Sequence, residues 1–342
     1  MTVDGPVLSQ KLGITLVHEH IVSDFSCLME EPEEATLKQL FHSPVTMENL
    51  GEVKWTPLAC KDNYQLHDIK VAIQEVMYFK MAGGGTIVDT TPWELGRDPL
   101  ALKRIARITG LNIVMGCGYY IQAAYSKQLN EQGIESITNR IVEEFTNGVG
   151  GTGVRPGVIG EIGTSSPITP SEEHSLRASA RAQVLLGAPF TIHLSPWDKE
   201  GERVLDIVES ENVKLHRVIL DHLSPTAPDI EYHDRLAKRG SYLGYDLFGF
   251  DHSLIKKGKW IFADWETVES IKEMIDRGHV SRILVSQDVA VKTRLVKYGG
   301  WGYAHILEHV IPLFREHGIG EKDIETILID NPRRILEWEA NA

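Results

Sequence analysis

Side chains that commonly bind metal ions stand at the ends of five short apolar segments of the chain. The first segment ends in two histidines separated by one residue, and the others end in one candidate ligand each: His18 and His20, Glu161, His193, His222, and Asp288. Because residues i and i+2 of a strand point to the same side, His18 and His20 can reach one ion. Each residue alone could instead be structural, as a hydrogen-bonded histidine or an aspartate that caps a helix. Their shared position at segment ends predicts a metal site.

The number of candidate ligands suggests two metal ions rather than one. One ion would bind His18, His20 and Asp288, and the second would bind the two remaining histidines, with Glu161 as a bridge. Two such ions hold a hydroxide between them, lower its pKa towards neutrality and polarise the oxygen of an electrophile. The mixed imidazole and carboxylate donors favour Zn²⁺, with Mn²⁺, Co²⁺ or Fe²⁺ as alternatives. Asp288 could also take the proton of the attacking water and give it to the leaving group.

Eight short apolar segments alternate with longer amphipathic stretches along the chain. The apolar segments are residues 13–18, 85–89, 112–116, 157–161, 189–193, 217–222, 241–246 and 282–288, and helical periods occur at 69–81, 99–109, 172–186 and 264–277. Continuous apolar segments are typical of parallel strands that are buried on both faces. Eight β/α units predict a single-domain (β/α)8 TIM barrel over residues 1–342, with a doubly wound sheet as the alternative. The C-terminal strand ends of such a barrel form its active site, and the candidate ligands stand there.

Two long connections interrupt this alternation. The first covers residues 21–84 after the first strand, and within it residues 22–63 show no clear helical period and contain Pro32, Pro44 and Pro57. A connection of this length indicates an active-site lid or an interface loop. Residues 248–262, after the seventh strand, form the second long loop.

The composition, with 42% hydrophobic and 24% charged residues among 342, is that of an ordinary globular protein. The 35 basic and 48 acidic side chains give a net charge of −13, which disfavours binding to nucleic acids or anionic membranes. No apolar segment approaches the ~18 residues of a membrane span, and the chain shows no secretory signal pattern. The 3 cysteines are widely spaced and show no disulfide framework. We therefore expect a cytoplasmic protein that acts on a small molecule.

Several motifs resemble the phosphotriesterase family of the amidohydrolase superfamily. They are residues 13–20 (GITLVHEH), 82–86 (AGGGT) and 297–303 (KYGGWGY), and its phosphotriesterase-related protein branch is further indicated by residues 159–163, 245–249, 292–295 and 329–332. The resemblance covers residues 12–336. It implies that the six candidate ligands form a binuclear metal site in which Asp288 carries the proton, and it implies a homodimer.

The sequence departs from phosphotriesterases proper at two positions of this resemblance. They usually bridge their metals with a carbamylated lysine on the fourth strand, where this chain has Glu161, as the related branch does. They also have an aspartate just after the histidine of the sixth strand, where Leu223 follows His222 here. Both differences point away from hydrolysis of phosphotriesters as the main activity.

Family members with this ligand arrangement hydrolyse lactones, phosphorylated sugar lactones and an N-acetylated sulfonate amide. The resemblance therefore implies a binuclear metal-dependent hydrolase in which a hydroxide between the ions attacks the carbonyl of a lactone, ester or N-acyl amide that can carry an anionic group. The alternative is a phosphotriesterase that uses the same metal centre. A binding protein that has lost catalysis is a third hypothesis, although such a protein should have lost at least one of the six ligands.

Three further residues are candidates for substrate binding. Arg294 lies six residues beyond Asp288, and its planar guanidinium suits a phosphate, sulfonate or carboxylate, although it could also be a solvated loop charge. Tyr120 follows the third strand and could polarise the substrate carbonyl or pack against neighbouring aromatic rings. Tyr245 ends the seventh strand and could belong either to the pocket or to the core.

Overall fold

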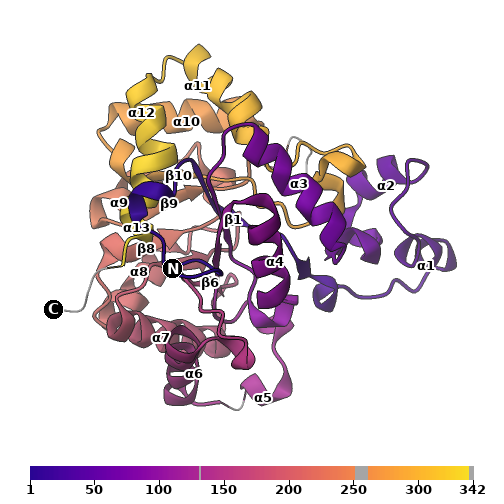
Figure 1. Ribbon diagram of the computed structural model, residues 1–342, viewed down its shortest axis with the longest axis horizontal. Coiled ribbons are helices and arrows are strands. Elements are labelled where there is room, and N and C mark those ends of the chain that lie inside the picture. Colours follow the sequence, from indigo (N-terminus) through magenta and orange to yellow (C-terminus); the bar gives the residue numbers. More distant parts are fainter. Residues whose placement is uncertain (131, 251–260, 339–342) are drawn as a thin grey trace.

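The computed structural model describes residues 1–130, 132–250 and 261–338, and its centre is a ring of eight parallel strands (Figure 1). These strands are β1 (Thr15–Glu19), β4 (Thr86–Asp89), β5 (Asn112–Met115), β6 (Ile159–Gly163), β7 (Phe190–His193), β8 (Val218–Leu220), β9 (Tyr242–Tyr245) and β10 (Ile283–Val285). Strands β1, β4 and β5 form one parallel sheet, and β6 to β10 form a second one in chain order.

Backbone hydrogen bonds close the two sheets into one barrel. The amide of Cys117 donates to the carbonyl of Gly160 at 3.0 Å, which joins β5 to β6. The amide of Asp288 donates to the carbonyl of His18 at 3.2 Å, which joins the end of β10 to β1. The predicted (β/α)8 barrel is therefore confirmed, and the alternative of a doubly wound sheet is wrong.

Apolar side chains fill both sides of the strand ring. Val17, Val88, Val114, Ile219 and Leu284, which come from five different strands, belong to one buried cluster. Side chains from strands on opposite sides of a ring can meet only inside it, so this cluster fills the barrel interior. The larger core cluster joins other strand residues to the surrounding helices.

Helices cover the outside of the strand ring (Figure 1). They are α3 (Ile69–Met81), α4 (Pro99–Thr109), α6 (Ile134–Asn147), α7 (Pro170–Leu186), α8 (Gly201–Ser210), α9 (Ile230–Arg239), α10 (Asp264–Asp276), α11 (Ile311–Glu316), α12 (Glu321–Glu325) and α13 (Asn331–Leu336), with the short α5 (Lys127–Asn130) before α6. The predicted helices at 69–81 and 99–109 match α3 and α4. None of the helices in the described ranges has the length and apolarity needed to cross a membrane.

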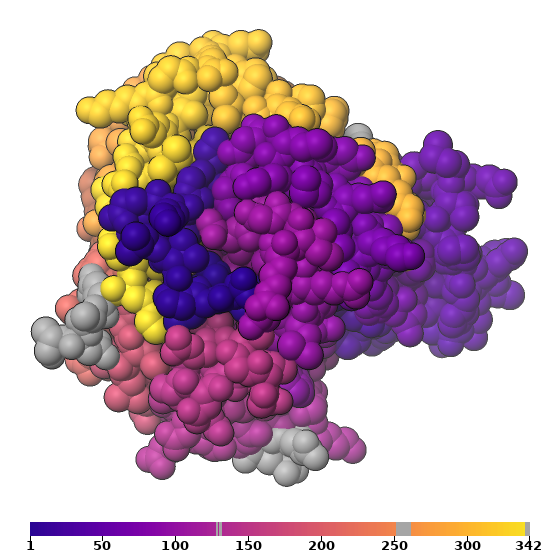
Figure 2. Space-filling model, viewed as in Figure 1, coloured from indigo at the N-terminus to yellow at the C-terminus, as the bar shows by residue number. Residues whose placement is uncertain are grey.

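The first long connection contains more regular structure than its sequence indicates. It holds the short helices α1 (Ala35–Phe41) and α2 (Leu50–Trp55), and β2 (Ser23–Asp24) pairs with β3 (Gln65–Leu66). The part of this connection that carries α1 and α2 projects to one side of the barrel, where Figures 1 and 2 show it in indigo to purple.

The projecting segment is tied to the chain that follows β10. Lys54 Nζ donates to the carbonyl of Gly299 at 2.7 Å, and the amide of Thr293 donates to Asn63 Oδ1 at 3.0 Å. These bonds make the segment part of the wall above the strand ends. Of the second predicted loop, residues 248–250 and 261–262 are described, and residues 251–260 lie outside the described part of the chain.

Helix α7 begins two residues before its predicted start, because a capping box defines its first turn. Thr169 Oγ1 accepts from the amide of Glu172 at 3.2 Å, and Glu172 Oε2 accepts from the amide of Thr169 at 3.0 Å. We expect Thr169→Ala to lower the free energy of unfolding by about 1 kcal/mol, because it leaves a helix N–H group without its acceptor. Urea denaturation checks this, with Ser171→Ala in the same turn as the control. Equal midpoints for the two variants would contradict the role of the cap.

Candidate metal centre and substrate pocket

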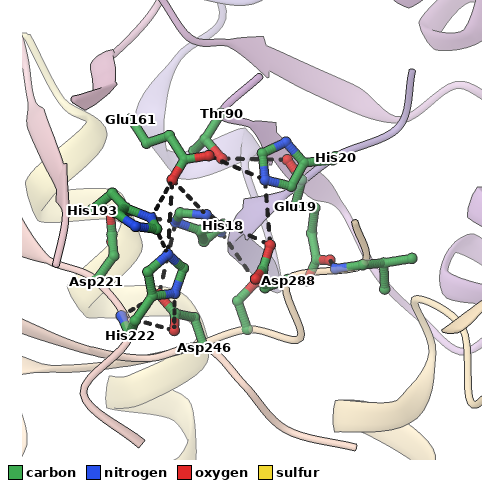
Figure 3. A network of polar contacts seen from close by, with 12 residues as sticks. His18, Glu19, His20, Thr90, Glu161, His193, Asp221, His222, Asp246 and Asp288 are labelled. Carbon is green, nitrogen blue, oxygen red and sulfur yellow. Dashed lines mark hydrogen bonds and ion pairs between the residues drawn. The ribbon is translucent and has the colours of Figure 1, made fainter. Parts of the chain in front are cut away.

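The six predicted ligands come together at the C-terminal ends of the barrel strands (Figure 3). His20 Nε2 lies 3.2 Å from Glu161 Oε1 and 3.3 Å from Asp288 Oδ1. His18 Nε2 lies 3.8 Å from the same Asp288 oxygen. One ligand atom from each of His18, His20 and Asp288 lies within 4.8 Å of the others, which is close enough for a shared ion.

A second group of the predicted ligands lies on the other side of Glu161. His193 Nδ1 lies 3.2 Å from Glu161 Oε2 and 2.8 Å from His222 Nε2. Glu161 therefore turns one carboxylate oxygen towards His20 and the other towards His193. This is the arrangement that a bridging carboxylate between two ions requires.

The buried histidine at the centre of this cluster supports metal binding. His18 is fully buried, and within the described ranges neither ring nitrogen makes a hydrogen bond, although Asp221 Oδ2 lies 3.4 Å from Nδ1 and Glu161 Oε2 lies 3.6 Å from Nε2. A buried polar atom without a partner costs about 1–3 kcal/mol, so such atoms in a native protein need an explanation. Divalent ions bound by these imidazole and carboxylate donors would provide one. The residues present thus fit a binuclear metal centre.

The local electrostatics keep the two ligand carboxyl groups ionised. Burial raises the pKa of Glu161, but the surrounding histidines, above all His18, outweigh burial and hold it well below its usual value. Burial also raises the pKa of Asp288, while His20 and its neighbours lower it to about 2. Both groups are therefore carboxylates at neutral pH, which is the form that binds metal.

A layer of polar residues behind the ligands orients the imidazole rings. Asp246 Oδ1 lies 3.1 Å from His222 Nδ1 and also accepts from the amide of His222 at 2.9 Å. Thr91 Oγ1 lies 2.9 Å from His20 Nδ1, and Asp221 Oδ2 lies 3.4 Å from His18 Nδ1. Contacts of this kind leave the other ring nitrogen facing the metal site. Thr91, Asp221 and Asp246 were not predicted from the sequence, although Asp221 and Asp246 stand at the ends of apolar segments.

Glu19, the last residue of β1, lies between His18 and His20 and supports the turn that carries Asp288. Its carboxylate accepts from Ser286 Oγ at 2.7 Å and from the amides of Gln287 and Val289, each at 2.8 Å. Asp288 has a left-handed backbone with φ of 51°, and His222 has φ of 61°. Non-glycine residues rarely adopt this conformation, and such strain is concentrated at functional sites.

A cavity of about 400 Å³ opens above the ligand cluster. His20, Glu161, His193, His222 and Asp288 line it, together with six aromatic side chains: Phe25, Tyr64, Tyr120, Trp197, Phe250 and Trp301. Its size and its few polar groups in an aromatic lining are typical of a site for a small molecule.

Of the three predicted substrate contacts, two line this cavity. The ring of Tyr120 packs edge-on against His193 with a centroid distance of 4.8 Å. The guanidinium of Arg294 donates to the carbonyl of Phe248 at 2.6 Å and lies over the ring of Phe250, 3.7 Å from its centroid.

The third predicted contact, Tyr245, lies outside the cavity. Its side chain is fully buried, and its hydroxyl is 2.7 Å from Nδ1 of His233 on α9. The residue that follows it, Asp246, faces the predicted ligands, and successive strand residues point to opposite faces. Tyr245 therefore packs between the barrel and its helices, and we exclude it from the substrate site.

Comparisons with known proteins agree with this architecture. A model of the phosphotriesterase family matches residues 1–336. An N-acetyltaurine hydrolase from Xenopus tropicalis is 36% identical over 341 residues, which cover 99% of this chain and 97% of that protein. A phosphotriesterase-related protein from Nematostella vectensis is also 36% identical, with 99% and 98% covered.

Solved structures of similar proteins have the same fold. A resiniferatoxin-binding protein from Rhodobacter sphaeroides is 41% identical and superposes with a TM-score of 0.96, covering 100% of this chain and 96% of that one. A lactonase from Listeria monocytogenes is 26% identical with a TM-score of 0.79, covering 99% of both chains.

Proposed function

Because this chain belongs to the phosphotriesterase family and is a metal-dependent hydrolase, we propose that it cleaves a carbonyl substrate that carries an anionic group. An N-acyl amide of an amino sulfonate or amino acid is the favoured class, since relatives named N-acetyltaurine hydrolase align with almost the whole chain. A lactone or ester is the next class, in line with the lactonase neighbour. The observation that carries the proposal is a single cavity with the ligand cluster at its floor and the Arg294 guanidinium in its wall.

Two divalent ions would be held by the six predicted ligands, and we propose that these ions are Zn²⁺ because the donors are mixed imidazole and carboxylate. Mn²⁺, Co²⁺ and Fe²⁺ are the alternatives. When bound, such ions supply a nucleophile at neutral pH and a Lewis acid for the carbonyl oxygen.

The protein's own side chains perform the remaining tasks. Asp288 takes the proton that the attacking water loses and delivers it to the leaving amine or alcohol, because it lines the cavity and is ionised. Burial holds the pKa of Tyr120 well above its usual value, so its hydroxyl stays protonated and can donate to the substrate carbonyl. Arg294 pairs with the anionic end of the substrate and so fixes which side of the carbonyl faces the ligand cluster.

Elemental analysis and a substrate panel on one preparation test this function. We expect about two divalent ions per chain and turnover of N-acyl sulfonates or N-acyl amino acids above that of lactones and of a phosphotriester. Turnover of paraoxon far above every carbonyl substrate would replace the proposal with a phosphotriesterase. A protein with no metal and no activity after Zn²⁺ or Mn²⁺ is added would contradict the metal centre. Light scattering on the same sample tests the homodimer that the family resemblance implies.

Arg294→Gln should weaken binding of anionic substrates selectively. A hydrogen bond to a charged group contributes about 1.5–3 kcal/mol, so we expect KM for an N-acyl sulfonate to rise roughly 10-fold to 100-fold. KM for a neutral amide of the same length should change much less. Steady-state kinetics on both substrates checks this, with Arg315→Gln on the surface as the control. An equal rise in KM for both substrates would mean that Arg294 supports the cavity wall rather than recognises an anion.

A further inference from the structure

A buried hydrogen-bonded pair of side chains lies behind the cavity wall, outside the predicted metal centre. His305 Nε2 lies 2.6 Å from Asp264 Oδ2, at the start of α10, and the two residues are 3% and 7% exposed. The other oxygen of Asp264 accepts from the amide of Gly249 at 2.7 Å. Neither His305 nor Asp264 is among the described residues that line the cavity. The pair thus contacts the cavity only through the residues that it holds.

The pair supports the wall formed by Trp301 and Gly249, which both line the cavity. The indole of Trp301 stacks on the imidazole of His305 with a centroid distance of 5.1 Å and an interplanar angle of 28°. Gly249 fits closely against both rings, since a Cβ there would lie 2.9 Å from His305 Cδ2 and 3.1 Å from Trp301 Cδ1. The absence of a side chain at this position lets the backbone reach the Asp264 carboxylate.

Gly249 belongs to a short segment, residues 247–250, which we call the strap and which also contacts Arg294. The guanidinium of Arg294 donates to the carbonyl of Phe248 and lies over the ring of Phe250. The strap is therefore bound to Asp264 through the amide of Gly249 and to Arg294 through the neighbouring residues on either side. Arg294 also donates to the carbonyl of Gln287 at 2.9 Å, so the strap supplies one of its two backbone anchors. A shift of the strap would remove that anchor and move the guanidinium relative to the predicted ligands.

We propose that His305 and Asp264 are positioning residues that set substrate recognition: they hold the strap and Trp301 so that Arg294 faces the anionic end of the substrate. The inference rests on the proposed function, because it concerns the same cavity and the same anion. Neither residue touches the reacting atoms. Loss of the pair should therefore raise KM for the anionic substrate and leave kcat nearly unchanged.

Three variants separate this role from a general loss of stability. His305→Phe keeps a ring against Trp301 and loses the bond to Asp264, and Asp264→Asn keeps an acceptor for Gly249 and loses the charge. His305→Gln is the conservative variant, because its side-chain amide can still donate to Asp264. The matched control is His309→Phe, since His309 also contacts Trp301, at a centroid distance of 4.9 Å, but is exposed.

The kinetic readout is the ratio of kcat/KM for an N-acyl sulfonate to that for a neutral N-acyl amide of the same length. We expect this ratio to fall about tenfold in His305→Phe and Asp264→Asn, through KM, as a misplaced binding group implies. His305→Gln should recover part of the ratio, and His309→Phe should retain the wild-type value. Thermal melts show whether each variant is folded. An unchanged ratio in folded His305→Phe and Asp264→Asn would overturn the proposal.

Crystal structures of the wild type and His305→Phe give a readout that needs no substrate. We expect the strap and the Arg294 guanidinium to move relative to the metal ligands in the variant. Wild-type positions of both would overturn the positioning role, whichever substrate the enzyme cleaves. A displaced strap in the variant, together with a wild type that hydrolyses neither substrate, would overturn the proposed function and leave the positioning role in place.

Discussion

Asp288→Asn is expected to lower kcat about 10³-fold, because general acid–base catalysis typically contributes 10²-fold to 10⁴-fold. Asparagine has the same shape and keeps an oxygen that can face a metal, but its amide cannot take a proton from water. In the wild type the histidines around Asp288 lower its pKa to about 2, so the proton acceptor is available at neutral pH. Steady-state kinetics on the best substrate of the panel measures the loss, and elemental analysis of the same sample reports how much metal remains.

The control for this variant is an aspartate outside the site. Asp206→Asn removes a carboxylate from an exposed ion pair with Arg239, and we expect it to retain wild-type kcat. If Asp288→Asn kept its metal and its kcat stayed within about threefold of wild type, the proton would have to move through another group. If the variant instead lost its metal, the loss of kcat would reflect the ligand role of Asp288, and metal titration would separate the two roles.

The barrel could be predicted because each strand is buried on both faces, and its sequence is therefore a continuous apolar segment. Residues 85–89 and 112–116 became β4 and β5, and the adjoining helices α3 and α4 match their predicted ranges. Asp68 caps α3, and Gly110 ends α4 in the left-handed conformation. Local signals thus agree with the tertiary structure in these regions.

The first long connection could not be predicted in the same way. Its helices α1 and α2 have seven and six residues, too few to show a helical period, and its paired strands have two residues each. Elements this short are marginal alone, so contacts distant in sequence decide whether they form. The bond from Lys54 to Gly299 is one such contact, and no local pattern indicates it.

The ligand cluster could be predicted because its members are chemically unusual for strand ends. The supporting residues are not unusual there: Asp221 and Asp246 resemble any polar residue that ends a strand. Their role depends on neighbouring strands, as the contact of Asp246 with His222 shows. The outward position of Tyr245 follows only once the structure shows that Asp246 faces the ligand cluster, since successive strand residues point to opposite faces.

Glu161→Gln is the variant expected to have the largest effect on metal content. Glu161 is the residue whose two oxygens reach both ligand groups, 3.2 Å from His20 Nε2 on one side and 3.2 Å from His193 Nδ1 on the other. The amide of glutamine is neutral and offers one oxygen, so it cannot serve as an anionic bridge. Changes behind a metal ligand already cost about 10-fold to 100-fold in affinity or activity, and loss of the bridge itself should cost at least 100-fold.

We therefore expect Glu161→Gln to retain no more than about one divalent ion per chain and to lose turnover that excess metal restores only in part. Elemental analysis after dialysis against a fixed free metal concentration measures the first effect, and kcat during metal titration measures the second. Glu172→Gln is the matched control, because Glu172 is a buried glutamate whose partners belong to the α7 cap and adjoining loops. Full metal content with wild-type kcat in Glu161→Gln would show that the two ligand groups act without a shared carboxylate. Metal loss in Glu172→Gln as well would point to general destabilisation, since none of the hydrogen bonds of that side chain is to a predicted ligand.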